Sequence, residues 1–205
     1  MQWIEAQSPI AQFIFAHGAG AGSDSDFMQQ MAANMAALGV SVGLFDFPYM
    51  QRAKQENKRR PPEKADKLLA SFNEHLEQRR SGLPLFIGGK SMGGRMASML
   101  VAEHPSDVQG VIAFGYPFHP PGKKDKLRVA HFADIKVPFC VLQGERDTFG
   151  KQSELLELVD TRPAQLHWLE DGDHSLVPRK KSGFTQQQQW QKAAELAVSF
   201  IKEHL

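Results

Sequence analysis

Six short apolar segments recur along the chain and predict buried β-strands. They cover residues 12–16, 40–47, 84–88, 110–115, 137–143 and 164–169. Most are nearly continuous apolar runs rather than alternating patterns, as expected for strands that are covered on both faces of a parallel sheet.

The stretches between these strands carry apolar residues at every third or fourth position, which is the spacing of an amphipathic helix. Helices are expected around Met31, Phe72, Met96 and Leu155. A last helix is expected from about residue 186, where Thr185 and Gln188 fit a capping box. The alternation of strands and helices predicts an open, doubly wound α/β sheet in a single domain that covers residues 1–205.

A glycine-rich turn places a serine between the third predicted strand and the helix around Met96. The pattern Gly89-x-Ser91-x-Gly93 is that of a nucleophile elbow, a sharp strand-to-helix turn that lifts the serine above the sheet. Small residues two positions before and after the serine avoid side-chain collisions there. The alternative, a phosphate-binding loop, would need a glycine at position 84, which is Pro84.

Two further strand ends carry the residues that such a serine needs. A serine nucleophile requires a histidine base, and the histidine requires a carboxylate that fixes its tautomer. With a nucleophile elbow, the expected chain order is serine, acid, histidine. Asp147 follows the strand at 137–143 and His174 follows the last predicted strand. Glu145 is an alternative acid, and His119 is an alternative base that breaks this order.

The turn at residues 17–22 follows the first predicted strand. Its glycines, at positions 18, 20 and 22, do not have the G-x-G-x-x-G spacing of a dinucleotide-binding loop. A His-Gly turn at this place instead supplies an amide for an oxyanion hole. We expect the backbone amides of Ala19 and Met92 to hold the oxyanion.

Five residues near these turns are candidates for the substrate pocket: His17, Gly18, Tyr49, Lys90 and His119. Lys90 either contacts an anionic substrate or, as we expect, has a structural role and pairs with a carboxylate at the sheet edge. The basic segment 51–60, a surface loop or an extension of the next helix, also follows a strand end, where open α/β sheets place their sites. A solvated basic face is the simpler interpretation of this segment.

Composition narrows the classes of function. The 205 residues contain 24 Lys+Arg and 23 Asp+Glu, a balance that argues against a nucleic-acid binder relying on counterion release. The single cysteine, Cys140, excludes an internal disulfide and a cysteine-rich metal site. The chain has neither a signal-peptide pattern nor an apolar stretch of about 18 residues. We therefore expect a cytoplasmic protein without membrane contact.

Taken together, these motifs resemble those of small, dienelactone-hydrolase-like α/β-hydrolases. More closely, the chain resembles the bacterial branch whose eukaryotic relatives include a hydrolase-like subunit of a histone acetyltransferase complex and a testis-expressed protein. The matching stretches span most of the chain: HGAGAGSD at 17–24, FDFPYM at 45–50, RRPP at 59–62, GGKSMGGRMAS at 88–98, GYPFHPPGK at 115–123, QGERDTFG at 143–150 and DGDHSL at 171–176.

The resemblance implies an α/β-hydrolase fold with a mostly parallel sheet of about six to seven strands. It implies Ser91 as nucleophile, Asp147 as acid and His174 as base, with no metal and no organic cofactor. The short connection after residue 115 leaves little or no room for a lid. The expected function is hydrolysis of an ester or related acyl bond in a small molecule. The alternatives are acyl transfer on the same triad and a hydrolase-fold protein that acts through its surface. The oligomeric state is not predicted.

Overall fold

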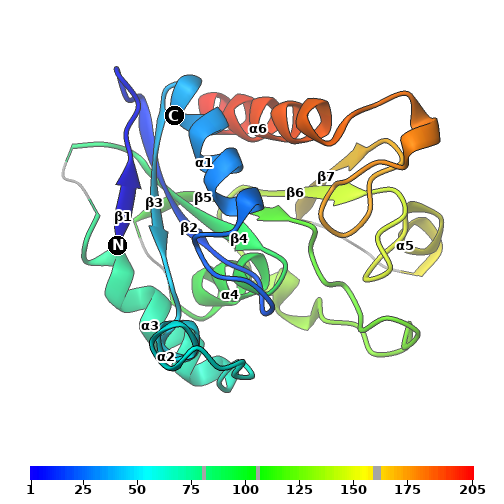
Figure 1. Ribbon diagram of the computed structural model, residues 1–205, viewed down its shortest axis with the longest axis horizontal. Helices are drawn as coiled ribbons and strands as arrows, with labels where there is room; N and C mark the ends of the chain where they lie inside the picture. Colours follow the sequence, from blue (N-terminus) through cyan, green and yellow to red (C-terminus); the bar gives the residue numbers. More distant parts are fainter. Residues whose placement is uncertain (80–81, 105–106, 159–162) are drawn as a thin grey trace.

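A single mixed sheet forms the centre of the molecule in the computed structural model, which describes residues 1–79, 82–104, 107–158 and 163–205. Seven strands lie in the order β1-β3-β2-β4-β5-β6-β7 (Figure 1). Their bounds are β1 Gln2–Ile4, β2 Ala11–Ala16, β3 Val40–Phe45, β4 Leu85–Lys90, β5 Val108–Phe114, β6 Phe139–Gly144 and β7 Ala164–Leu169. Strands β2 to β7 pair in parallel, so the predicted doubly wound parallel sheet is confirmed.

Strand β1 was not expected from the sequence. It pairs antiparallel with β3, with Trp3 opposite Gly43, and it forms one edge of the sheet. Gln2 is exposed, and Trp3 and Ile4 are only partly buried. A segment this short carries no periodicity that would predict a strand.

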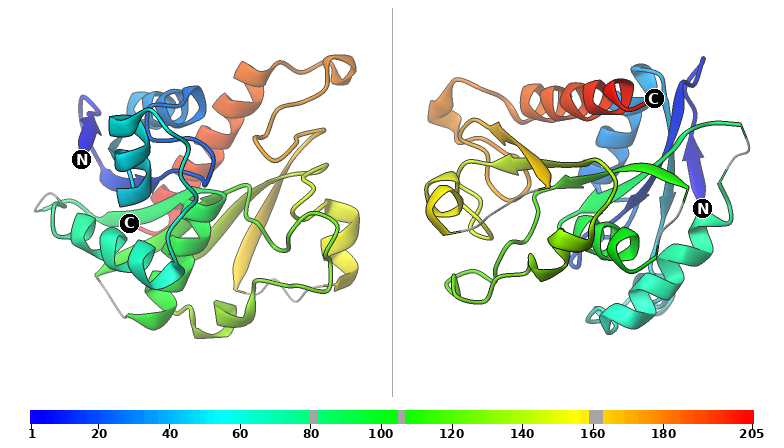
Figure 2. Two further views of the ribbon diagram at one scale, coloured as in Figure 1. Left: turned by 60° about the horizontal axis from the view of Figure 1, so that its bottom comes forward. Right: turned by 180° about the vertical axis from the view of Figure 1, so that it is seen from behind.

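Helices cover both faces of the sheet. Helices α1 (Asp26–Ala37) and α6 (Gln186–Glu203) pack against each other on one face, and α3 (Ala65–Leu76) and α4 (Met92–Glu103) lie side by side on the other (Figures 1 and 2). Each layer buries its apolar stripe against the strands, which gives two hydrophobic cores separated by the sheet. The predicted capping box of Thr185 and Gln188 is present at the start of α6.

The segment after β3 differs from the prediction. Strand β3 ends at Phe45, and α2 (Pro48–Glu56) follows at once. Pro48 occupies the first helical turn, where its fixed φ and missing N–H are tolerated. The basic segment 51–60 is therefore a surface loop only in its second half, and it is not an extension of the next helix. Its first half is the body of α2, and its second half follows the left-handed residue Asn57 (φ 49°) that ends the helix.

The remaining helical elements are short. Helix α5 (Gln152–Leu158) follows β6, and short 3-10 turns occur at η1 (Ala130–Asp134) and η2 (Lys180–Ser182). Between β5 and β6 the structure contains η1 and no longer element, so no lid domain covers the sheet edge. Among the described residues, no helix has the length and apolar character needed to cross a membrane.

Candidate active site

Ser91 lies between β4 and α4 in a conformation that residues with side chains rarely adopt, with φ 50° and ψ −112°. Its amide donates to the Phe114 carbonyl on β5 at 2.9 Å, and its carbonyl accepts from the Arg95 amide at 3.1 Å. Strain of this kind stores on the order of 1–3 kcal/mol and persists only where the surroundings enforce it. The turn has the backbone form of a nucleophile elbow.

Two glycines make this turn sterically feasible. A Cβ on Gly89 would lie 2.3 Å from the carbonyl carbon of Gly93, and a Cβ on Gly93 would lie 2.3 Å from the Ala16 carbonyl oxygen. Both distances are far below van der Waals contact, and the atoms met are backbone atoms that cannot rotate away. Larger residues at either position would push α4 away from β2 and displace Ser91.

The structure brings Ser91, His174 and Asp147 into one chain of hydrogen bonds. Ser91 Oγ lies 2.8 Å from His174 Nε2, and His174 Nδ1 lies 2.8 Å from Asp147 Oδ2. Because an ionised carboxylate can only accept, the hydrogen of a neutral His174 ring belongs on Nδ1. Nε2 then carries the lone pair that faces the Ser91 hydroxyl.

Asp147 is fully buried and is held by three donors. Besides His174, its carboxylate accepts from Gln143 Nε2 at 2.8 Å and from the Phe149 amide at 2.8 Å. Gln143 is itself buried at the end of β6, and its amide also bonds both backbone groups of Tyr116. Gln143 was not expected from the sequence. The sequence feature that could have indicated Gln143 is a polar residue at the end of an apolar strand, four residues before the acid.

Two other acids near His174, the alternative acid Glu145 and the neighbouring Asp173, face other partners. Glu145 Oε2 accepts from the Asp171 amide at 2.9 Å. Asp173 Oδ1 accepts from the amides of Ser175 and Val177 at 2.8 and 3.0 Å and so shapes the loop that carries His174. Of the acids considered, Asp147 is the one in contact with the His174 ring.

Lys90 precedes the serine and, among the residues that the structure describes, pairs with no carboxylate, contrary to our expectation. Its Nζ donates to the carbonyl oxygen of His174 and lies 5.6 Å from the centre of the Phe27 ring. The side chain is 8% exposed, and this burial lowers the pKa of Lys90 to about 8. The lysine thus links the turn at Ser91 to the loop at His174.

A cavity of about 380 Å³ opens beside Ser91 and His174. We call it the acyl cavity. Phe27, Met28 and Phe149 supply apolar wall, and Gly18 and Ala19 lie on the side of the first turn. The Phe149 ring stacks on the His174 imidazole with centroids 4.2 Å apart. Phe149 was not expected from the sequence, because its contact depends on the path of the loop after β6.

His17 and Tyr49 do not line the acyl cavity as expected but support its wall from behind. His17 is fully buried, and its Nδ1 donates to the Gly18 carbonyl at 2.7 Å while its Nε2 accepts from the Phe47 amide at 3.1 Å. Burial lowers the pKa of His17, which favours this neutral form. The Tyr49 hydroxyl donates to the carbonyls of Gly18 and Ala19 at 3.2 and 3.1 Å. Both side chains therefore fix the loop that carries Ala19.

His119 was expected near the pocket and lies elsewhere. It is 1% exposed, its Nδ1 is 3.0 Å from the Pro120 carbonyl, and its Nε2 is 3.5 Å from Glu154 on α5. It is absent from the walls of the acyl cavity. Cys140 is buried within β6, and burial raises the pKa of its thiol to about 12, so a thiolate nucleophile is not available there.

Solved structures share this fold at low sequence identity. A dienelactone hydrolase from Anabaena variabilis is 19% identical, with a TM-score of 0.74 over 99% of this chain and 90% of that one. Est1E from Butyrivibrio proteoclasticus, with ferulic acid bound, is 12% identical, with a TM-score of 0.71 over 98% and 94%. A monoacylglycerol lipase from Paleococcus ferrophilus is 14% identical, with a TM-score of 0.67 over 97% and 98%.

The sequence itself identifies the family. No curated protein matches it significantly, and the narrower bacterial branch named above stays a prediction. Residues 9–202, which include every turn described here, match the alpha/beta hydrolase domain. The expected dienelactone-hydrolase-like fold agrees with this match and with the solved structures. The chain is a member of the alpha/beta hydrolase domain family.

Proposed function

We propose that the protein is a serine hydrolase that cleaves an ester or related acyl bond. In this proposal Ser91 is the nucleophile, His174 the base and Asp147 the acid. The observation that carries it is the continuous chain of two 2.8 Å contacts from Ser91 Oγ through the His174 ring to the buried Asp147 carboxylate. A chain that had exchanged catalysis for a purely binding role would not need this arrangement at the mouth of a cavity.

The proton follows the hydrogen bonds. Ser91 Oγ attacks the carbonyl carbon of the acyl group while its proton passes to His174 Nε2. Asp147 stabilises the resulting imidazolium through Nδ1–H. Collapse of the tetrahedral intermediate breaks the bond to the leaving group, which takes the proton from Nε2. Water then attacks the acyl-enzyme with His174 as base, and Ser91 recovers its proton.

The amides of Met92 and Ala19 are the proposed oxyanion donors. The Met92 amide begins α4 and, within the part of the chain that the structure describes, donates to no backbone carbonyl outside its helix. The Gly18 carbonyl shares its peptide plane with the Ala19 amide and accepts hydrogen bonds from Tyr49 and His17. These bonds fix the orientation of the Ala19 N–H. Loss of one such donor typically costs about 2.7–4 kcal/mol of transition-state stabilisation.

The shape of the site favours small acyl groups. The acyl cavity holds about 380 Å³, and no lid closes over it. Among the fold relatives, one is a dienelactone hydrolase and one holds ferulic acid, both consistent with a compact substrate. We therefore propose a small-molecule ester as substrate. A cytoplasmic location stays a prediction from the sequence.

A fluorophosphonate probe tests the proposal directly, because it reacts only with an activated serine. The wild-type protein should be labelled at Ser91, and Ser91→Ala should not be labelled. Hydrolysis of p-nitrophenyl acetate is measured in parallel, and circular dichroism confirms folding. A folded wild-type protein that gives neither an adduct nor ester hydrolysis would contradict the assignment.

A further inference from the structure

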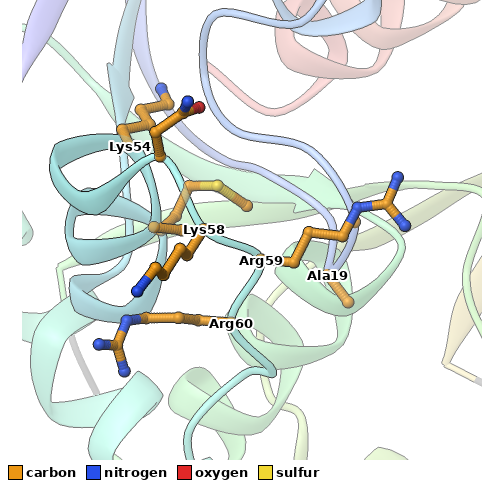
Figure 3. A pocket seen from close by; sticks show the side chains of 9 residues that line it. Ala19, Lys54, Lys58, Arg59 and Arg60 are labelled. Atoms are coloured by element: carbon orange, nitrogen blue, oxygen red, sulfur yellow. The ribbon is translucent and has the colours of Figure 1, made fainter.

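A second cavity lies beside the acyl cavity, on the other side of the turn at 18–20. It holds about 520 Å³ and is lined by the end of α2 and the residues that follow. We call it the basic cavity. Four cationic side chains line it, Lys54, Lys58, Arg59 and Arg60, and no carboxylate does (Figure 3). The proposed mechanism uses none of them.

Two of the four cations are neutralised by neighbouring acids. Lys54 contacts Asp24 at 2.8 Å and Asp46 at 2.5 Å, and Arg60 contacts Glu56 at 2.5 Å. Burial opposes the charge on Lys54, but these two carboxylates together raise its pKa. A lysine or arginine that already pairs with a carboxylate adds little net positive charge with which the cavity could attract an anion.

Lys58 and Arg59 have no such partner. Neither forms an ion pair or a side-chain hydrogen bond with any residue that the structure describes. In Figure 3 the Arg59 side chain extends past Ala19, towards the turn that both cavities share. The basic cavity therefore has about two uncompensated positive charges.

The backbone holds these cations on a defined turn. The left-handed Asn57 ends α2, and the Lys58 amide donates to the Ala53 carbonyl at 3.0 Å. Pro61 and Pro62 follow Arg60 directly and restrict the backbone on that side. Preorganised cations lose less conformational entropy when an anion binds.

The two cavities share the first turn as a common wall. Ala19 and Gly20 line both of them, and Ala19 is a proposed oxyanion donor. A substrate with its acyl bond at Ser91 would have to extend over this turn to place a remote group beside Arg59. Because two unpaired cations best match two negative charges, the remote group should be a dianion.

We propose that the basic cavity binds the phosphate group of a phosphorylated ester whose acyl bond is cleaved at Ser91. The inference rests on the serine hydrolase function proposed above. It assigns Lys58 and Arg59 as the residues that contact the phosphate, and Arg60 and Lys54 as cations already paired within the wall. A singly charged carboxylate would be bound more weakly at the same place.

Three butyryl esters of related three-carbon alcohols, with leaving groups of different charge, test the proposal. They are the butyryl esters of glycerol, glycerate and glycerol 3-phosphate, with leaving-group charges of about 0, −1 and −2. For wild type, kcat/KM for the phosphate ester should exceed that for the glycerol ester at least tenfold, with the glycerate ester between them. In Lys58→Gln/Arg59→Gln this ratio should fall at least tenfold.

Lys192→Gln/Lys202→Gln is the matched control, because it removes the same charge from exposed positions on α6. It should leave the ratio unchanged. A wild-type ratio near one, equal rates for carboxylate and phosphate esters, or an unchanged ratio in Lys58→Gln/Arg59→Gln would overturn the proposal.

A binding measurement separates failure of the subsite from failure of the hydrolase assignment. Calorimetric titration of Ser91→Ala with glycerol 3-phosphate needs no catalysis, and binding should be lost in the triple variant that also carries Lys58→Gln and Arg59→Gln. Inorganic phosphate should compete for this site. If no ester is cleaved but this binding is present, the phosphate site stands and the hydrolase assignment falls. If esters are cleaved and no binding is found, the phosphate site falls alone.

Discussion

The acyl cavity and the basic cavity share one turn but are built on opposite principles. Behind the acyl cavity, the carboxylate of Asp147 is fully buried and accepts three hydrogen bonds, and the cavity walls are largely apolar. In the basic cavity, Lys58 and Arg59 are exposed and form no ion pair with any described residue. The difference shows that proton transfer needs charges that are fully satisfied and fixed, whereas recognition of an anion needs charge left uncompensated.

The largest effect is expected when the nucleophile is removed, because only the acyl cavity depends on it. Ser91→Ala should lower kcat for an ester roughly 10⁴-fold or more, since the members of a triad act as a unit. Binding of glycerol 3-phosphate in the basic cavity should remain within about twofold. Stopped-assay kinetics and calorimetry measure the two quantities. Residual activity above about 1% of wild type would show that another group attacks the acyl bond.

The second test concerns Lys90, the buried cation of the acyl cavity. Its pKa is lowered from 10.5 to about 8 by burial. Below pH 8 the lysine is protonated in both folded and unfolded chains, so its contribution is constant. Between pH 8 and 10.5 the unfolded chain binds more protons, so this group makes the free energy of unfolding rise with pH. The rise should amount to about 3 kcal/mol.

Lys90→Met should remove that rise. Urea unfolding at pH 8 and pH 10.5 measures it as a difference between variant and wild type. Lys136→Met is the control, because Lys136 also donates to a backbone carbonyl but is exposed. Equal pH dependence in wild type and Lys90→Met would mean that Lys90 is not held in a dry environment.

The third test removes a donor behind the triad. Gln143→Leu takes one hydrogen bond from Asp147 and leaves the backbone of Tyr116 without its side-chain partner. We expect kcat to fall about tenfold, which is about 1.4 kcal/mol, and the protein to lose about 1–3 kcal/mol of stability. Gln189→Leu removes another buried glutamine, which bonds Glu170. The Gln189→Leu variant should be less stable but should keep the kcat of wild type. A similar loss of kcat in Gln143→Leu and Gln189→Leu would show that general destabilisation causes it.

The smallest effect is expected from ionic strength, because the charges of the basic cavity are exposed and that of Asp147 is buried. Raising the ionic strength from about 0.05 to 0.5 M screens exposed charges but hardly affects buried ones. The kcat/KM for butyryl glycerol 3-phosphate should fall several-fold, and that for butyryl glycerol should stay nearly constant. Equal salt dependence for the two esters would argue against binding of the phosphate by exposed cations.

Much of the fold could be predicted because buried parallel strands leave nearly continuous apolar runs in the sequence. Strand β1 was not predicted because its three residues are too few to show a hydrophobic periodicity. Helix α2 was not predicted because Pro48 directly follows an apolar run whose pattern predicts a strand up to residue 47. In both places the outcome depends on what the rest of the fold packs against the segment.

The candidate site divides in the same way. Ser91, Asp147 and His174 could be proposed from motif and chain order, and their meeting in one hydrogen-bonded chain agrees with that proposal. Gln143, Phe149 and the supporting role of Tyr49 could not, because each depends on tertiary contacts between distant loops. Lys90 could be singled out but not its partner, since a backbone carbonyl leaves no mark in the sequence.

Strand β1 has a consequence beyond completing the sheet. A long exposed edge strand offers unpaired N–H and C=O groups on which another chain can assemble. Here β3, six residues long, is covered on that side by a strand of three residues that runs against its neighbour. The edge left open on this side is too short to template an intermolecular sheet. Resistance to edge-to-edge aggregation on this side is thus a property of the one antiparallel strand among the described residues.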